Sequence, residues 1–121
     1  MSKQRRRDQL VTIVSQLPEA TCEGEQHLAL TVRSKKFGYY LDDHHGDGIT
    51  GVAFKAPIGE QDALISSDPA RFYIPAYVGS KGWVGLRLDL DDIDWREVSE
   101  LLTEAYRLQA PRRLFAQLNS Q

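Results

Sequence analysis

The stretch "HLALTVRSKKFGYYLDDHHGDGITGVAFK", residues 27–55, decides the fold, because apolar and polar residues alternate through three of its segments. Alternation with a period of two is typical of half-buried strands. The alternating segments are residues 27–33, 35–43 and 49–55, and only short polar connections separate them. Consecutive strands joined by short turns pair as hairpins, so the stretch predicts an antiparallel meander.

The rest of the chain alternates between helical and strand patterns. Apolar residues at helical spacing indicate helices, and two further alternating segments indicate strands. The expected helices cover residues 8–17, the neighbourhood of 63–65, Asp94 to Leu108 and 111–118, and the expected strands lie in residues 71–77 and 83–90. The predicted order is therefore α-β-β-β-α-β-β-α-α, with five strands in all.

Length and composition favour one domain. With 121 residues, 41% of them hydrophobic, the chain can build a single modest core over residues 8–118, preceded by residues 1–7 as a basic tail or the start of the first helix. No apolar run approaches the roughly 20 residues of a membrane span, and no signal peptide is evident, so we expect a cytoplasmic protein without a membrane partner. The lone Cys22 offers neither a disulfide nor a zinc cage.

One face of the predicted sheet combines small residues with aromatic and cationic ones. The face opposite the apolar positions would carry Ala29, Gly38, Gly51, Ala53 and Gly85 beside Thr31, Arg33, Tyr40, Lys55, Trp83 and Arg87. Small residues allow close approach, while arginine, lysine and aromatic rings supply phosphate contacts and stacking surfaces. The face therefore predicts either a ligand or nucleic-acid surface, or a surface covered by a terminal helix or a second copy of the chain.

The loop "DDHHGDG" invites a metal-binding interpretation, with His44, His45 and Asp47 as weak candidate ligands. Its residue types are also those of a hairpin turn, and Phe54 stands where a calcium loop needs a glutamate. Its glycines match G-x-G-x-x-G, but the following residues predict a strand and not a helix that would hold a phosphate. The sequence shows no catalytic constellation, so we expect a non-enzymatic protein without a metal or cofactor.

Four segments carry a family resemblance: "KKFGYYLDDHHGDG", "FKAPIG", "DPARFYIPAYVGSKGWVGLRLD" and "DWREVSELLTEAYRLQAPRRL". In their residues and order the chain resembles the YjbR/MmcQ-like family of small bacterial proteins, from about Leu17 to Leu118. The resemblance implies a two-layer α+β fold, an antiparallel sheet with helices on one side, in an arrangement similar to that of secretion chaperones.

The resemblance also implies a function. The family is commonly described as DNA-binding through a "double wing", a concave sheet face with hairpin edges. Carried over to this chain, that description predicts a cationic and aromatic nucleic-acid-binding face formed by Arg33, Tyr40, Lys55, Lys81, Trp83 and Arg87. The alternative is a protein-interaction or chaperone-like module, in which the same face docks a partner segment or a second copy, so that the protein is a monomer or a homodimer.

Overall fold

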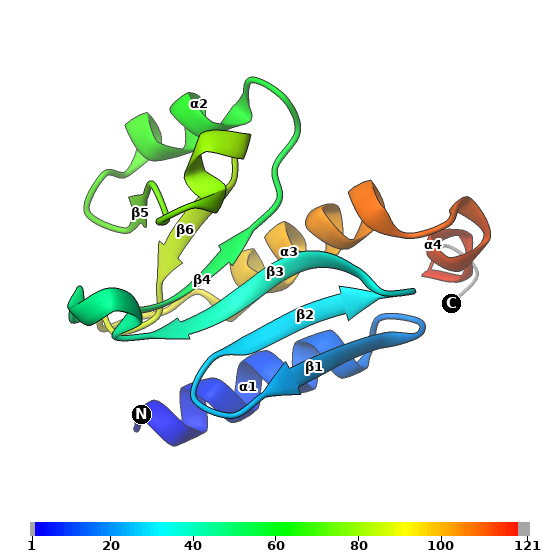
Figure 1. Cartoon of the computed structure of the whole chain (residues 1–121), viewed down its shortest axis with the longest axis horizontal. Helices are drawn as coiled ribbons and strands as arrows, with labels where there is room; N and C mark the ends of the chain where they lie inside the picture. Colours follow the sequence, from blue (N-terminus) through cyan, green and yellow to red (C-terminus); the bar gives the residue numbers. More distant parts are fainter. Residues whose placement is uncertain (1, 119–121) are drawn as a thin grey trace.

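The structure is a computed structural model that describes residues 2–118, and it forms a two-layer α+β domain (Figure 1). Two short 3₁₀ helices, η1 and η2, lie in its connections. The helices and strands are α1 (Lys3–Ser15), β1 (Ala20–Gly24), β2 (Leu28–Val32), β3 (Lys35–Asp42), η1 (His44–Gly46), β4 (Thr50–Phe54), α2 (Glu60–Ser67), β5 (Phe72–Tyr73), η2 (Val78–Lys81), β6 (Val84–Arg87), α3 (Trp95–Gln109) and α4 (Arg112–Leu118). Because α1 begins at Lys3, most of the basic N-terminal segment, residues 1–7, belongs to this helix.

The sheet has six strands in the order β1-β2-β3-β4-β6-β5, and every neighbouring pair is antiparallel. The class and the meander are as predicted, but the expected count of five was wrong. The additional strand is β1, which pairs with β2 at one edge of the sheet. Its residues are exposed or half-buried on both faces, so the segment lacks the alternation that marks a strand in sequence.

The core lies between one face of the sheet and the helices α1 and α3, which Figure 1 shows behind the strands. Leu10 and Val14 of α1 and Leu102 of α3 are fully buried against it. The side chain of Asp94 caps α3 by accepting hydrogen bonds from the backbone N–H groups of Arg96 and Glu97, as the sequence pattern indicates. The other face, called the open face here, is not covered by α1 or α3.

A β-bulge in β3 changes which side chains face the core. The register between β2 and β3 shifts after the pair Leu30–Gly38, so Phe37 and Tyr40 both point to the helix side although they are three residues apart. Tyr40 is 1% exposed, with the Arg7 guanidinium 5.6 Å from its ring centroid. The expectation that Tyr40 and Gly38 lie on the open face was therefore wrong, and Tyr39 takes that place.

The open face is partly covered by the segment that leads into β6. The ring of Tyr73 in β5 lies over Gly85, where an added Cβ would come within 2.5 Å of the ring carbons. Such a contact is too short for any side chain, so glycine is required at this position. Burial raises the pKa of Tyr73 to about 12. The small residues of the predicted face thus accommodate the chain's own tyrosine at β6, which leaves less of the face open than the sequence suggests.

Candidate functional site

The six predicted contact residues do not form one surface. Tyr40 lies in the core, and Lys55 leaves the end of β4 toward α3, where its Nζ is 3.3 Å from Oε1 of Gln109. Trp83 is only 7% exposed and packs on Tyr39, with ring centroids 5.9 Å apart. The two aromatic side chains of the predicted site therefore contribute to packing and present little surface for stacking.

Two of the predicted cations are neutralised by the chain itself. Arg33 donates to both carboxylate oxygens of Glu19, at 2.6 and 2.9 Å, and this bond lowers the pKa of Glu19. Arg87 makes the same paired contact with Asp89, at 2.9 and 3.1 Å. Burial opposes ionisation of Asp89, but the bonds from Arg87 and from the Thr50 N–H outweigh it and hold its pKa below the usual range.

The connection between β3 and β4 contains His44 and His45 and is called the histidine loop here; it brings the two imidazole rings into contact. His44 and His45 contact each other with ring centroids 4.1 Å apart, and His44 also contacts His27 at 5.2 Å. Nδ1 of His27 accepts the backbone N–H of Asp42, so that nitrogen is already engaged. Within residues 2–118 the structure contains no group of three or more His, Cys, Asp or Glu side chains placed to hold a metal ion.

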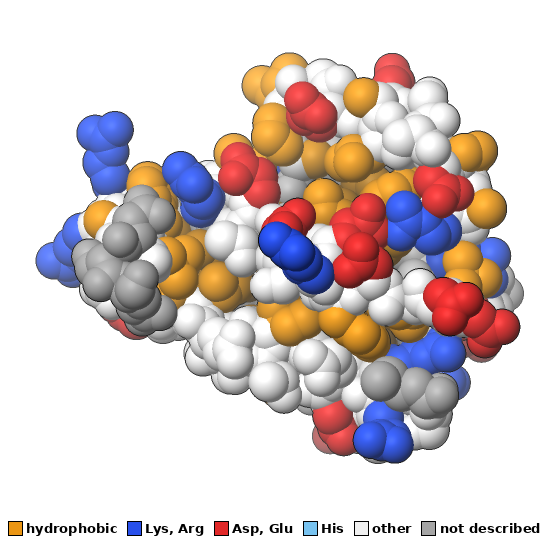
Figure 2. Space-filling model, turned by 180° about the vertical axis from the view of Figure 1, so that it is seen from behind, with side chains coloured by type: hydrophobic (Ala, Val, Ile, Leu, Met, Phe, Trp, Pro, Cys, Tyr) orange, Lys and Arg blue, Asp and Glu red, His pale blue; other side chains and the backbone are white. Residues whose placement is uncertain are grey.

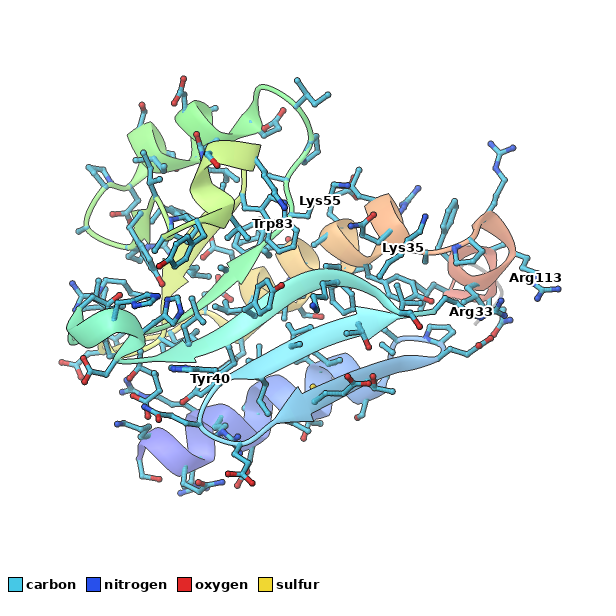
Figure 3. The ribbon with its side chains drawn as sticks, in the orientation of Figure 1. Arg33, Lys35, Tyr40, Lys55, Trp83 and Arg113 are labelled. Atoms are coloured by element: carbon cyan, nitrogen blue, oxygen red, sulfur yellow. The ribbon has the colours of Figure 1, made fainter. Side chains whose placement is uncertain are left out.

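Exposed cations gather instead at one end of the molecule, where the β2–β3 turn meets the end of α3 and α4 (Figures 2 and 3). Gln109 connects the parts, since its side chain donates to the carbonyl of Lys36 and accepts from Lys55. Glu19, the partner of Arg33, also interacts electrostatically with Arg113 of α4. We call this region the basic end; it consists of the half-buried Lys55 and of the exposed Arg33, Lys35, Lys36, Arg107, Arg112 and Arg113.

Four exposed cations of the basic end contact neither a carboxylate within ion-pair distance nor an aromatic ring among the described residues, although Arg113 also feels the charge of Glu19. Lys35, Lys36, Arg112 and Arg113 are exposed, and the ion pairs found in residues 2–118 do not involve them. Lys36 also lines an open groove of about 400 Å³ that runs over the first two strands on the open face. Unpaired, solvated cations on neighbouring elements are suited to binding an anionic partner.

The opposite end of the open face holds a second depression, which we call the aromatic hollow. Its volume is about 180 Å³, and its lining consists of Tyr39, Leu41, His44, Ala76, Tyr77 and Val78. Tyr39 and Leu41 are alternate residues of β3 and form the part contributed by the sheet, while the segment before β6 supplies the other wall. This lining contains no Asp, Glu, Lys or Arg, and burial is the main cause that lowers the pKa of His44.

Tyr77 is held in a strained conformation at the rim of this hollow. Its backbone angles, φ 63° and ψ −64°, are those of a γ-turn of the rare kind, and the Val78 N–H donates to the Ala76 carbonyl at 2.7 Å. The side chain is 74% exposed, with its ring centroid 5.1 Å from that of His45. Strain of this kind costs on the order of 1–3 kcal/mol and is concentrated at functional sites.

Sequence reasoning missed the residues that define both regions. The pairs Lys35–Lys36 and Arg112–Arg113 are visible as "KK" and "RR", but nothing in the sequence places them together. Tyr77 stands directly before the glycine-containing loop "VGSKG". Because loops lie on the surface, an aromatic residue directly beside a loop is a signal in the sequence that could have indicated an exposed ring.

These features define a class: a small α+β domain with an antiparallel sheet, helices on one face and hairpins at both ends of the other. The YjbR family model matches residues 15–108, and the chain belongs to this family. The fold is similar to that in the crystal structure of Deinococcus radiodurans protein DR2400, which carries a DUF419 domain, with a TM-score of 0.69 and 20% identity over 84% of this chain and 76% of that one. A comparison with curated proteins finds no significant match. No helix within residues 2–118 is long and apolar enough to span a membrane.

Proposed function

We propose that this protein is a non-enzymatic nucleic-acid-binding module whose phosphate contacts come from the basic end. The observation that carries the proposal is the convergence of Lys35, Lys36, Arg112 and Arg113, none of which forms an ion pair with a described residue. Cations that are not paired within the protein can displace the counterions of a phosphate backbone, and this release supplies most of the non-specific affinity for nucleic acids.

The proposal modifies the contact set that the sequence suggested. Arg33 and Arg87 are bound to carboxylates, so a phosphate would have to compete with Glu19 or Asp89. Lys55 and the exposed Lys81 remain candidates for secondary contacts. The net charge of −2 opposes long-range attraction, so the binding is expected to depend on the local field of the basic end and to weaken with salt.

The test is fluorescence anisotropy with labelled single- and double-stranded DNA at about 50 and 200 mM salt. The quadruple variant K35A/K36A/R112A/R113A should reduce the magnitude of the logarithmic salt slope by about 3 on a single strand, because four phosphate contacts contribute roughly 0.7 each. The control is Arg96→Ala, which removes an exposed cation of α3 that is paired with Glu100. Equal salt slopes for the wild type and the quadruple variant would reject the proposal.

A second candidate is a protein-interaction module, and exposed apolar residues favour it. Ile74 is 62% exposed and lies near Tyr77 on the segment between β5 and η2. A partner segment or a second copy could bury both side chains. Under this alternative, sedimentation velocity would show a complex that the double variant Ile74→Ser/Tyr77→Ser dissociates, whereas the basic-end variants would leave it intact. Trp83→Ala is a poor test, because Trp83 is buried and its loss would disturb packing.

A further inference from the structure

The aromatic hollow has a composition that the basic end lacks. Its lining brings together the rings of Tyr39, His44 and Tyr77 with aliphatic side chains. The exposed carboxylates of Asp43 and Asp47 lie in the adjacent β3–β4 loop. A phosphate would be repelled there, so the group that fits this end of the open face is uncharged, planar and apolar on its faces.

The hollow and the basic end share one strand and one face. Lys36 pairs with Thr31, and Tyr39 pairs with Ala29 and Ala53, which places Lys36 and Tyr39 on the open face of β3. From Lys36 to Leu41 the strand advances roughly 16 Å at about 3.3 Å per residue. A flexible chain that places its anionic groups on Lys36 can therefore reach the hollow with a neighbouring part of the same molecule.

We propose that the aromatic hollow receives an unpaired base of a single-stranded nucleic acid whose phosphates lie on the basic end. The inference rests on the proposed function and names its substrate class. Bases stack on aromatic side chains with little regard to sequence, and a base held in a duplex is already stacked and paired. Tyr77 fits this role because it lines the hollow, its side chain is largely exposed, and the γ-turn fixes the backbone from which the ring projects.

The test compares three probes by anisotropy: a labelled oligothymidylate of about 12 nucleotides, an abasic strand of equal length and a duplex of equal length. The wild type should bind the oligothymidylate more tightly than the abasic strand. Tyr77→Ala should weaken binding of the oligothymidylate about tenfold, leave the abasic strand unaffected and keep the salt slope unchanged. Tyr77→Phe, which keeps the ring, should bind as the wild type does.

The matched control is Ile74→Ala, which removes an exposed apolar side chain of the same segment without touching the lining of the hollow. Equal affinity of the wild type for the oligothymidylate and the abasic strand would overturn the inference, as would a duplex bound as tightly as the single strand. Self-association that Tyr77→Ala abolishes would also overturn it and assign the hollow to a second copy.

The two proposals fail in different ways. If the quadruple basic-end variant loses binding while Tyr77→Ala binds every probe normally, the basic end binds phosphate and only the assignment of the hollow is wrong. If no probe shows salt-dependent binding, the proposed function itself is wrong, and the assignment of the hollow to a base falls with it.

Discussion

The two hairpins at opposite ends of β3 differ in how they use charge. The β2–β3 hairpin turns through two residues, Arg33 and Ser34, both with positive φ, and its lysines extend into solvent. The β3–β4 hairpin needs the seven residues 43–49, and its carboxylates bind its own backbone. Asp43 accepts the N–H of Gly48 at 2.7 Å, and Asp47 accepts the N–H of Ile49 at 2.9 Å.

The difference shows which charges remain available to a partner. Polar groups that satisfy local backbone donors stabilise a loop but have little capacity left for a ligand. Asp42, at the end of β3, is also engaged within the chain, because its carboxylate accepts hydrogen bonds from the side chains of Lys3 and Thr50. The lysines at the other end of the strand have no such partner among the described residues. Charge content in a sequence is therefore a poor guide to binding until the internal partners are known.

The largest expected effect comes from reversing charge at the β2–β3 hairpin. The variant K35E/K36E should weaken binding of a single strand by about 100-fold or more at 50 mM salt, because two phosphate contacts are replaced by repulsion. A comparison matched in charge sets His45→Glu at the other hairpin against Lys36→Gln at the basic end, because each variant lowers the net charge by one; His45→Glu should weaken binding less. Anisotropy titrations measure both affinities, and similar losses for the two variants would show that overall charge, and not the basic end, determines binding.

Backbone conformation separates the same two hairpins in stability. Ser34 has a φ of 68° in a tight hairpin turn, where glycine is favoured, so Ser34→Gly should stabilise the protein by about 0.5–1 kcal/mol. His45 also has a positive φ, of 56°, but His45→Gly removes its ring contacts with His44 and Tyr77. Urea unfolding should therefore show a smaller gain, or a loss, for His45→Gly. An equal gain in both variants would mean that the ring contacts contribute nothing.

Much of the fold could be predicted, and the errors have local causes. The meander and the α3 cap follow from periodicity and capping chemistry, which depend on neighbouring residues. The edge strand β1 was not predicted, because a strand exposed on both faces needs no alternation of apolar and polar residues. The misplaced Tyr40 follows from the bulge at β3, since an inserted residue reverses the phase of every later side chain and no residue type marks it.

The candidate site could be predicted only in part, because it depends on pairing across long distances. The sequence indicated a cationic face, but the neutralisation of Arg33 by Glu19 joins residues 14 positions apart. The basic end requires Lys36 and Gln109 to meet, a contact across 73 positions. Such contacts are set by the way α3 packs across the sheet, so a single sequence without structural information does not reveal which cations remain unpaired.

Removing the internal partner of Arg33 should sharpen the charge comparison. Glu19→Gln frees the guanidinium that now binds the carboxylate, which should add one phosphate contact, steepen the salt slope on a single strand by about 0.7 and raise affinity about threefold. Glu23→Gln is the control, because it removes the same charge from the same groove without releasing Arg33. If both variants gain equally in affinity and slope, lower negative charge explains the effect and the release of Arg33 does not.

The smallest effect concerns pH at the histidine loop. Burial, followed by the neighbouring His45 and His27, lowers the pKa of His44 below its ordinary value of 6.5. On acidification the unfolded chain therefore takes up this proton at a higher pH than the folded protein does. The contribution of His44 to the free energy of unfolding is present above pH 6.5, and it is lost as the pH falls below 6.5 and through the pKa of the folded state. The carboxylates with lowered pKa, such as Glu19 and Asp89, lose their contributions at more acidic pH. The interval between about pH 7.5 and 5.5 therefore separates the contribution of His44 from those of the carboxylates.

Urea unfolding midpoints of the wild type and of His44→Gln, measured at both limits of this interval, test the prediction. The wild type should lose more stability on acidification than the variant, which cannot bind the proton. Identical pH dependence in both proteins would show that the pKa of His44 does not differ between the folded and unfolded states. His44 would then carry a proton at pH 5.5, the lining of the aromatic hollow would be charged at that pH, and the affinity for the oligothymidylate would change between pH 7.5 and 5.5.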